Sequence, residues 1–392
     1  MSQTLSPPPA AHPRATLWTL LAGNFIIGTG VLLPAGLLNA ISGDLAITPA
    51  TAGLLMLVGG VVVAVSAPLV AGFTSGIDRR LLLTLSLMLY AAGHLASALA
   101  PDFTLLVVVR ALTVLGAAVF TPQAAATAGL LVPVQRRAGA IAFIFIGWSA
   151  ASVAGIPLGS YFAALTSWRA VFAGMGIACA LAAALVWITL PRGLFVQPLT
   201  SAAWKHAFTT PALLVVLLVT LFSMSGQMTV FAYIAPVMRD VFAAGPEQVA
   251  IAFAVSGIAG VIGNAIAART VAHLGIDRVI AIAVGLLIAG LAIFAASFGH
   301  YLVALIGVAL WGLGSFSSNS LQQSRLVAIA PSLAAATVAL NTSIVYVGQA
   351  VGAGLGGWFV SKAITPSIAW TACALTVAAL LASILATRMT KR

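Results

Sequence analysis

The side chains best placed for chemistry are Arg110 and His94, because each lies within a long apolar segment. An arginine at the centre of a hydrocarbon layer costs at least ~2.5–3.5 kcal/mol, so Arg110 is expected to face protein or a wet cavity. The alternative is a structural arginine that snorkels to the nearby interface. A histidine titrates near neutral pH, so His94 could carry a proton, or it could be a satisfied packing residue.

Other groups that could do chemistry are scarce. The chain has six Asp or Glu residues and two Cys in 392 residues, and the acidic ones fall at the ends of apolar segments or between them. Enzymes need a nucleophile with a base, a carboxylate pair or a metal cluster, and no GxSxG or HExxH motif occurs. We expect no enzymatic activity, no metal and no cofactor.

The composition predicts an all-α integral membrane protein. Hydrophobic residues make up 62% of the chain and charged residues 6%, against roughly 25% charged in soluble domains. Apolar runs of the length that crosses a bilayer recur from end to end. The net charge of +11 lies between these runs, so it indicates membrane topology and not a nucleic-acid partner.

Charged, proline and glycine residues divide the chain into twelve expected transmembrane helices. These spans lie at 17–40, 51–74, 81–99, 104–128, 138–160, 169–190, 211–235, 249–270, 279–297, 302–325, 335–360 and 369–388. They predict a cytoplasmic tail at 1–16, a six-helix bundle at 17–190, a cytoplasmic linker at 191–210, a second bundle at 211–388 and a cytoplasmic tail at 389–392.

The basic residues predict the orientation in the inner membrane. With both termini in the cytoplasm, thirteen of the seventeen Lys and Arg residues lie on that side, as the positive-inside rule requires. They are Arg14, Arg79, Arg80, Arg136, Arg137, Arg192, Lys205, Arg269, Arg278, Arg325, Arg388, Lys391 and Arg392.

A repeated tetrapeptide indicates that the two bundles share one plan. GIDR begins at Gly76 and again at Gly275, and the same offset aligns Gln123 with Gln322. Each tetrapeptide falls in the turn between the second and third spans of its half. Chance similarity of two hydrophobic halves is the alternative. A repeat of six spans is typical of transporters whose halves rock around a site near the membrane midplane.

Several segments resemble the major facilitator superfamily, and within it the twelve-span drug or sugar–proton antiporters of the arabinose-efflux-permease type. They are VAGIPLGSYFAALTSWRAVF at 153–172, LLPAGLL at 32–38, FAYIAPVM at 231–238 and LNTSIVYVGQAVGAGLGGW at 340–358. The resemblance covers nearly the whole chain. It implies two pseudo-symmetric six-helix bundles, and an exporter that exchanges its solute for protons.

The resemblance also assigns expected coupling and gating residues, with departures. Asp78, Arg79 and Arg80 match part of the family's cytoplasmic charge network, although Ser75 and Gly76 stand where its Asp-Arg pair is usual. Arg110 matches the motif of the fourth span and is expected to tune proton coupling or to contact substrate. Val31 stands where many relatives carry a membrane-embedded acid, which leaves His94 as a candidate proton carrier and weakens the antiport prediction.

The span at 138–160 is expected to present a smooth face, because small residues recur at every fourth position. These residues are Gly147, Ala151, Gly155 and Gly159. Close approach of another helix is possible there, and we expect this face to form the interface between the halves, with Pro157 bending the span. Ordinary small-residue packing is the compatible alternative.

Polar and aromatic residues of the spans that begin near 17, 104, 211, 302 and 335 are the expected substrate contacts. The predicted set is Asn24, Thr113, Gln123, Gln227, Tyr233, Trp311, Asn319, Gln322 and Asn341. We expect a monomer that exports a small drug-like or sugar-like solute by alternating access, with protons as the exchanged partner. A passive facilitator of the same fold is the nearest alternative, and a membrane sensor without transport is another.

Overall fold

The computed structural model describes residues 13–74, 76–133, 136–195, 205, 208–297, 299–364 and 366–390, and across these ranges the chain is helical, with no strand. Twelve of its helical segments are long and apolar enough to cross a membrane, so the expected fold class is confirmed. Most of the expected tails and linker, at 1–12, 196–204, 206–207 and 391–392, lies outside the described residues.

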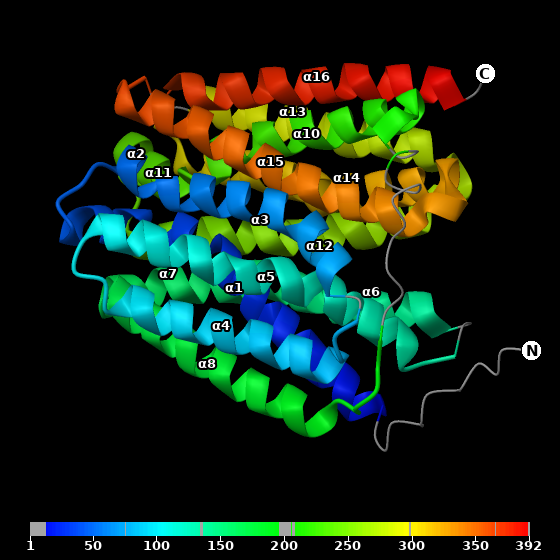
Figure 1. The fold of residues 1–392 in the computed structure, drawn as a ribbon. Coiled ribbons are helices and arrows are strands. Elements are labelled where there is room, and N and C mark those ends of the chain that lie inside the picture. The colour runs from blue at the N-terminus through cyan, green and yellow to red at the C-terminus, as the bar shows by residue number, and fades with distance from the viewer. Residues whose placement is uncertain are drawn as a thin grey trace, which may run out of the picture.

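The first half of the chain forms one bundle, drawn blue to green in Figure 1. Its elements are α1 (Pro13–Asp44), α2 (Pro49–Ala52), α3 (Leu54–Phe73), α4 (Arg79–Ala98), α5 (Phe103–Leu130), α6 (Arg137–Ala150), the π-helical η2 (Ala151–Gly155), α7 (Ile156–Leu165) and α8 (Trp168–Thr189).

The second half forms another bundle, drawn green to red. Its elements are α10 (Pro211–Phe231), α11 (Ile234–Phe242), α12 (Pro246–Leu274), α13 (Ile276–Ala296), α14 (Tyr301–Ile329), the 3-10 turn η3 (Pro331–Leu333), α15 (Ala334–Ser361) and α16 (Pro366–Thr390). Contacts of α3 with α15, and of α12 with η2 and α7, join the bundles.

Two of the expected spans are interrupted. The span predicted at 138–160 runs on to Leu165 and contains η2, where the N–H of Ile156 donates to the carbonyl of Ala151, five residues back. Pro157 has no N–H to donate, and a π-helical turn is one way to accommodate it. The span predicted at 211–235 breaks at Tyr233, between α10 and α11.

The repeated tetrapeptide begins a helix in both halves, but in two different ways. Asp78 caps α4 by accepting hydrogen bonds from the N–H groups of Arg80 at 2.9 Å and Leu81 at 3.3 Å. Asp277 instead lies in the first turn of α13 and pairs with Arg325 at 3.2 Å. Gly275 precedes it with φ of +79°, a conformation that glycine adopts without strain.

The hydrophobic core shows where the bundles are joined. We call the end at which α1 begins and α16 ends the terminal end, and the opposite end, with α2 and α11, the far end (Figure 1). One cluster of buried residues crosses between the bundles and includes Leu38, Met56 and Met238 at the far end. Toward the terminal end, the buried clusters lie mainly within one bundle each, although Tyr346 of α15 joins the cluster of the first bundle. The bundles are therefore packed together at the far end.

Candidate functional site

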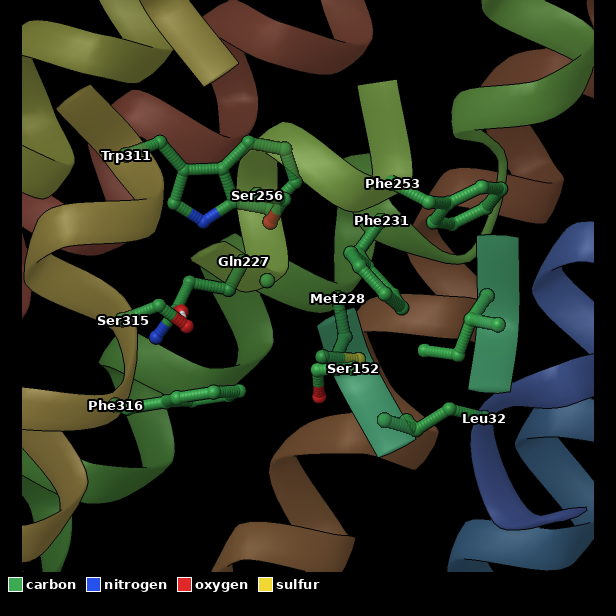
Figure 2. A pocket seen from close by; sticks show the side chains of 12 residues that line it. Leu32, Ser152, Gln227, Met228, Phe231, Phe253, Ser256, Trp311, Ser315 and Phe316 are labelled. Carbon is green, nitrogen blue, oxygen red and sulfur yellow. Dashed lines mark hydrogen bonds between the residues drawn. The ribbon is translucent and has the colours of Figure 1, made fainter. Parts of the chain in front are cut away.

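A cavity lies between the two bundles. Ile156, Phe231, Phe253 and Trp311 of the core that joins the bundles border it. Its volume is about 50 Å³, which is room for roughly three to five water molecules. Twelve residues line it: Leu32, Ser152, Ile156, Gln227, Met228, Phe231, Phe253, Ser256, Gly257, Trp311, Ser315 and Phe316 (Figure 2). They come from α1, η2, α7, α10, α12 and α14, so both bundles contribute.

Two of the predicted substrate residues, Gln227 and Trp311, lie in this lining. The amide nitrogen of Gln227 donates to the carbonyl and the hydroxyl of Ser223, both at 3.2 Å, and its oxygen accepts from Ser315 at 2.6 Å. The indole N–H of Trp311 has no hydrogen-bond partner, although its side chain is 1% exposed. The cavity thus combines a fixed amide with an unused donor.

Close backbone approach positions the α12 side of the cavity. A Cβ added to Gly257 would lie within 2.8 Å of the nitrogen of Val153 and still closer to the carbonyl of Ser152, so α12 packs directly on η2. This contact places Phe253 and Ser256 opposite Ser152. The sequence prediction missed all four residues, because it took substrate contacts from other spans. The small residues of the run SGIAG, which begins at Ser256, were the available signal.

The predicted coupling residues Arg110 and His94 form a second polar cluster, buried inside the first bundle. Arg110 of α5 is 1% exposed and donates through Nη2 to the carbonyl of Gly30 in α1, while its Nε and Nη1 have no partner. His94 of α4 is fully buried, and neither ring nitrogen is hydrogen-bonded. Tyr90 packs edge-on against His94, with ring centroids 4.6 Å apart.

This cluster contains a cation without an acidic partner. Phe172 of α8 lies against both groups, 6.0 Å from the guanidinium of Arg110 and 5.5 Å from the His94 ring. Arg110 therefore points into the bundle and faces protein as expected, and the alternative that it snorkels to an interface is wrong. A Cβ at Gly30 would come within 2.7 Å of Nε2 of His94, so α1 packs directly on the imidazole.

The predicted glycine face of the fifth span contacts a different helix from the one expected. A Cβ on Gly155 would overlap Thr29, and a Cβ on Gly159 would overlap Leu33, and both of these residues belong to α1. The face is therefore packed within the first bundle, and the prediction that it forms the interface between halves is wrong. The physical reason is that α1 runs through the middle of its bundle and needs a smooth partner there.

Arg79 and Arg80, which were predicted as gating residues, both contact other helices of the first bundle. Arg79 is fully buried and donates to the side chain of Gln123 and to the carbonyl of Thr74. Arg80 stacks over the ring of Trp187, with 4.3 Å between its Cζ and the ring centroid. Gln123, predicted as a substrate contact, is thereby engaged by Arg79 and lies outside the cavity lining.

The remaining predicted substrate residues also lie outside the cavity lining. Asn24 donates to the carbonyl of Ile144 at 3.3 Å and accepts from Thr121 at 2.9 Å. Asn341 donates to Asn319 at 3.1 Å. Three others complete the predicted set: Thr113, which donates to the carbonyl of Val109; Gln322, whose buried amide has no partner; and Tyr233, which donates to the carbonyl of Ala353.

The described residues form twelve helices that are long and apolar enough to cross a membrane, in two bundles with a cavity between them, an arrangement typical of membrane transporters. The family profile of the Major Facilitator Superfamily matches residues 20–353. The chain belongs to this superfamily, as its sequence motifs predicted.

Curated relatives and solved structures agree with this assignment. The chain is 31% identical to a chloramphenicol resistance protein of Streptomyces lividans over 334 residues, covering 83% of this chain and 85% of that protein. It is 28% identical to the inner membrane transport protein YdhP of Escherichia coli (strain K12), covering 88% of each chain. The crystal structure of a D-xylose-proton symporter has the same fold, with a TM-score of 0.77 at 17% identity over 94% of this chain and 96% of that chain.

Proposed function

We propose that this protein exports a small drug-like or sugar-like solute across the inner membrane by alternating access, in exchange for protons. The observation that carries the proposal is the cavity between the bundles, closed at the far end by a shared core and bordered toward the terminal end by cores that lie mainly within one bundle each. This arrangement suits a site that opens to one side at a time.

The direction of transport rests on orientation and on relatives. Thirteen of the seventeen basic residues fall on one side of the expected topology, which favours a cytoplasmic terminal end. The far end then faces outward, and the observed packing is that of a transporter closed to the outside. A relative named as a chloramphenicol resistance protein supports export of a drug-like solute, and one named as an inner membrane transport protein supports the location.

His94 is the proposed proton carrier. The six acidic residues cap helices, lie in first turns or stand near the ends of α1 and α11, so no carboxylate lies in the middle of a span. His94 faces Arg110 from α5, Tyr90 from its own helix and Phe172 from α8. A proton on His94 would place a second positive charge beside Arg110 in a region of low dielectric constant.

That repulsion gives Arg110 its proposed role in coupling. The guanidinium holds the carbonyl of Gly30, so a charge placed on His94 would push directly on the contact between α5 and α1. Since α1 also contributes Leu32 to the cavity, protonation and solute binding would act on the same helix. The two events can then favour opposite states of the transporter, as exchange requires.

Transport into everted membrane vesicles tests the function. Radiolabelled chloramphenicol should accumulate inside vesicles that contain the protein, and more strongly when their interior is acidified; D-xylose serves as the sugar arm of the assay. Flux of either compound that does not depend on the proton gradient would identify a passive facilitator. Saturable binding of chloramphenicol to purified protein without flux of either compound would identify a sensor.

Replacement of His94 with Gln tests the coupling group. The amide keeps a polar side chain but binds no proton, so gradient-driven accumulation of chloramphenicol should be lost while downhill flux continues. His273→Gln is the matched control, because His273 is exposed near the end of α12. Unchanged gradient dependence in His94→Gln would assign proton transfer to another group.

A further inference from the structure

The indole N–H of Trp311 is a buried donor that the protein itself leaves unused. Trp311 is 1% exposed and packs edge-on against Phe231, with ring centroids 6.1 Å apart. A phenylalanine could make the same packing contact without burying a polar group. A buried donor without a partner costs about 1–3 kcal/mol, so this one requires an explanation.

Figure 2 shows where this donor points. The indole nitrogen of Trp311 is directed toward the space that it shares with Gln227 and Ser256, and the aromatic ring of Phe316 borders the same space below. The polar atoms of Gln227 are already engaged with Ser223 and Ser315. Trp311 therefore remains as a donor for a molecule in the cavity, and the hydroxyl of Ser256 lies beside it.

The lining carries no charge. None of the twelve lining residues is acidic, basic or histidine. Arg110 does not reach the cavity, because its guanidinium is directed at Gly30 inside the first bundle. A charged molecule would lose its hydration here without gaining an opposite charge, which is costly. Three phenylalanines and a tryptophan instead offer apolar and aromatic surface.

We propose that this cavity selects an uncharged molecule with an aromatic or apolar body and a hydrogen-bond acceptor, which takes the hydrogen bond of Trp311 Nε1. The inference rests on the function proposed above and names the class of its solute. The cavity must widen toward the terminal end to admit a solute of drug size.

A pair of probes that differ only in the acceptor isolates this hydrogen bond. Acetophenone carries a carbonyl group where ethylbenzene carries a methylene group, and both are neutral and of similar size. Binding to purified full-length protein is measured from the concentration dependence of its thermal unfolding. The apparent affinity for acetophenone should exceed that for ethylbenzene by roughly 2- to 12-fold, as one net hydrogen bond provides.

The variant Trp311→Phe tests whether the preference for acetophenone depends on the indole N–H. It removes the N–H and keeps an aromatic ring, so the preference for acetophenone should fall below about twofold. Trp370→Phe is the matched control, because Trp370 is 51% exposed in α16 and the preference should survive there. The probe pair in the unaltered protein still tests the inference if Trp311→Phe does not fold.

Charged probes test the proposed preference for uncharged molecules. Tetraphenylphosphonium and benzoate should bind at least tenfold more weakly than acetophenone. Equal or tighter binding of either ion, an equal affinity for the two neutral probes, or no binding of any probe would overturn the inference. Export of chloramphenicol combined with any of these results would leave the proposed function standing, whereas an acetophenone preference without any transport would contradict the function alone.

Discussion

The contact between Gly53 and Tyr233 offers a direct test of whether the two bundles are closed at the far end. It lies between α2 and α3 of the first bundle, and a Cβ placed on it would overlap the ring and hydroxyl of Tyr233 from the second bundle. Its backbone has φ of −61° and ψ of −18°, ordinary helical values that alanine also adopts. The glycine is therefore required by the contact and not by the turn.

Gly53→Ala should open the far end. The added methyl group displaces Tyr233, which is 1% exposed and donates to the carbonyl of Ala353 at 3.0 Å. Loss of that buried hydrogen bond costs about 1–3 kcal/mol, which shifts the equilibrium away from the closed state by about 5- to 160-fold.

Thiol labelling measures this shift. Cysteine is introduced at Ser152 in the cavity lining, in a background without Cys179 and Cys373, and a membrane-impermeant maleimide is applied from the far side. Gly53→Ala should raise the labelling rate at least about fivefold. Gly59→Ala in α3 is the matched control, because a Cβ there meets its nearest neighbour at an ordinary 3.7 Å.

A double-mutant cycle decides whether Tyr233 is the cause. Tyr233→Ala removes the side chain that the new methyl group would overlap, so adding Gly53→Ala to it should change the labelling rate little. Equal effects of Gly53→Ala in the presence and absence of the Tyr233 side chain would refute the reasoning. So would far-side labelling of Gly53→Ala at the rate of the Gly59→Ala control.

Two further substitutions test contacts inside the bundles. Asp277→Asn leaves Arg325, 3% exposed, without its carboxylate; stability measured by denaturant unfolding should fall by roughly 1–3 kcal/mol, less than for a fully buried pair because Asp277 is 29% exposed. Gly155→Ala drives a methyl group against Thr29 and should cost roughly 1–3 kcal/mol in the same assay, whereas Gly139→Ala, with nothing within 4 Å, should cost none.

The sequence was sufficient to predict the spans and the family, because both depend on local composition. Twelve apolar stretches of bilayer length are visible without knowing any contact between them. Gln227 and Trp311 could be proposed for the same reason, as polar or aromatic side chains in the middle of apolar segments. The partners of each span could not be predicted, and this limited the prediction of the site.

The glycine face of the fifth span, whose partner was predicted wrongly, shows why the sequence could not identify the helix partners. In a soluble helix the apolar stripe marks the side that packs against protein, but a membrane helix is apolar on its lipid side as well. The spacing of Gly155 and Gly159 therefore revealed that some helix approaches closely without identifying which one. Gly257 is one of the glycines that do meet the other bundle, as Gly53 and Gly60 also do, and it lies in α12.

Arg110 and His94 were identified correctly from the sequence as residues within spans, but the neighbours that surround them were not predicted. An arginine in a span suggests a nearby acid, yet the polar neighbours of the cation found here are an imidazole, a backbone carbonyl, the hydroxyl of Tyr90 and the thiol of Cys179. A span without an embedded acid therefore need not lack a titrating group. If His94 carries the proton, the charge that opposes it is Arg110, so coupling in this protein would work by repulsion between two cations and not by neutralisation of an acid.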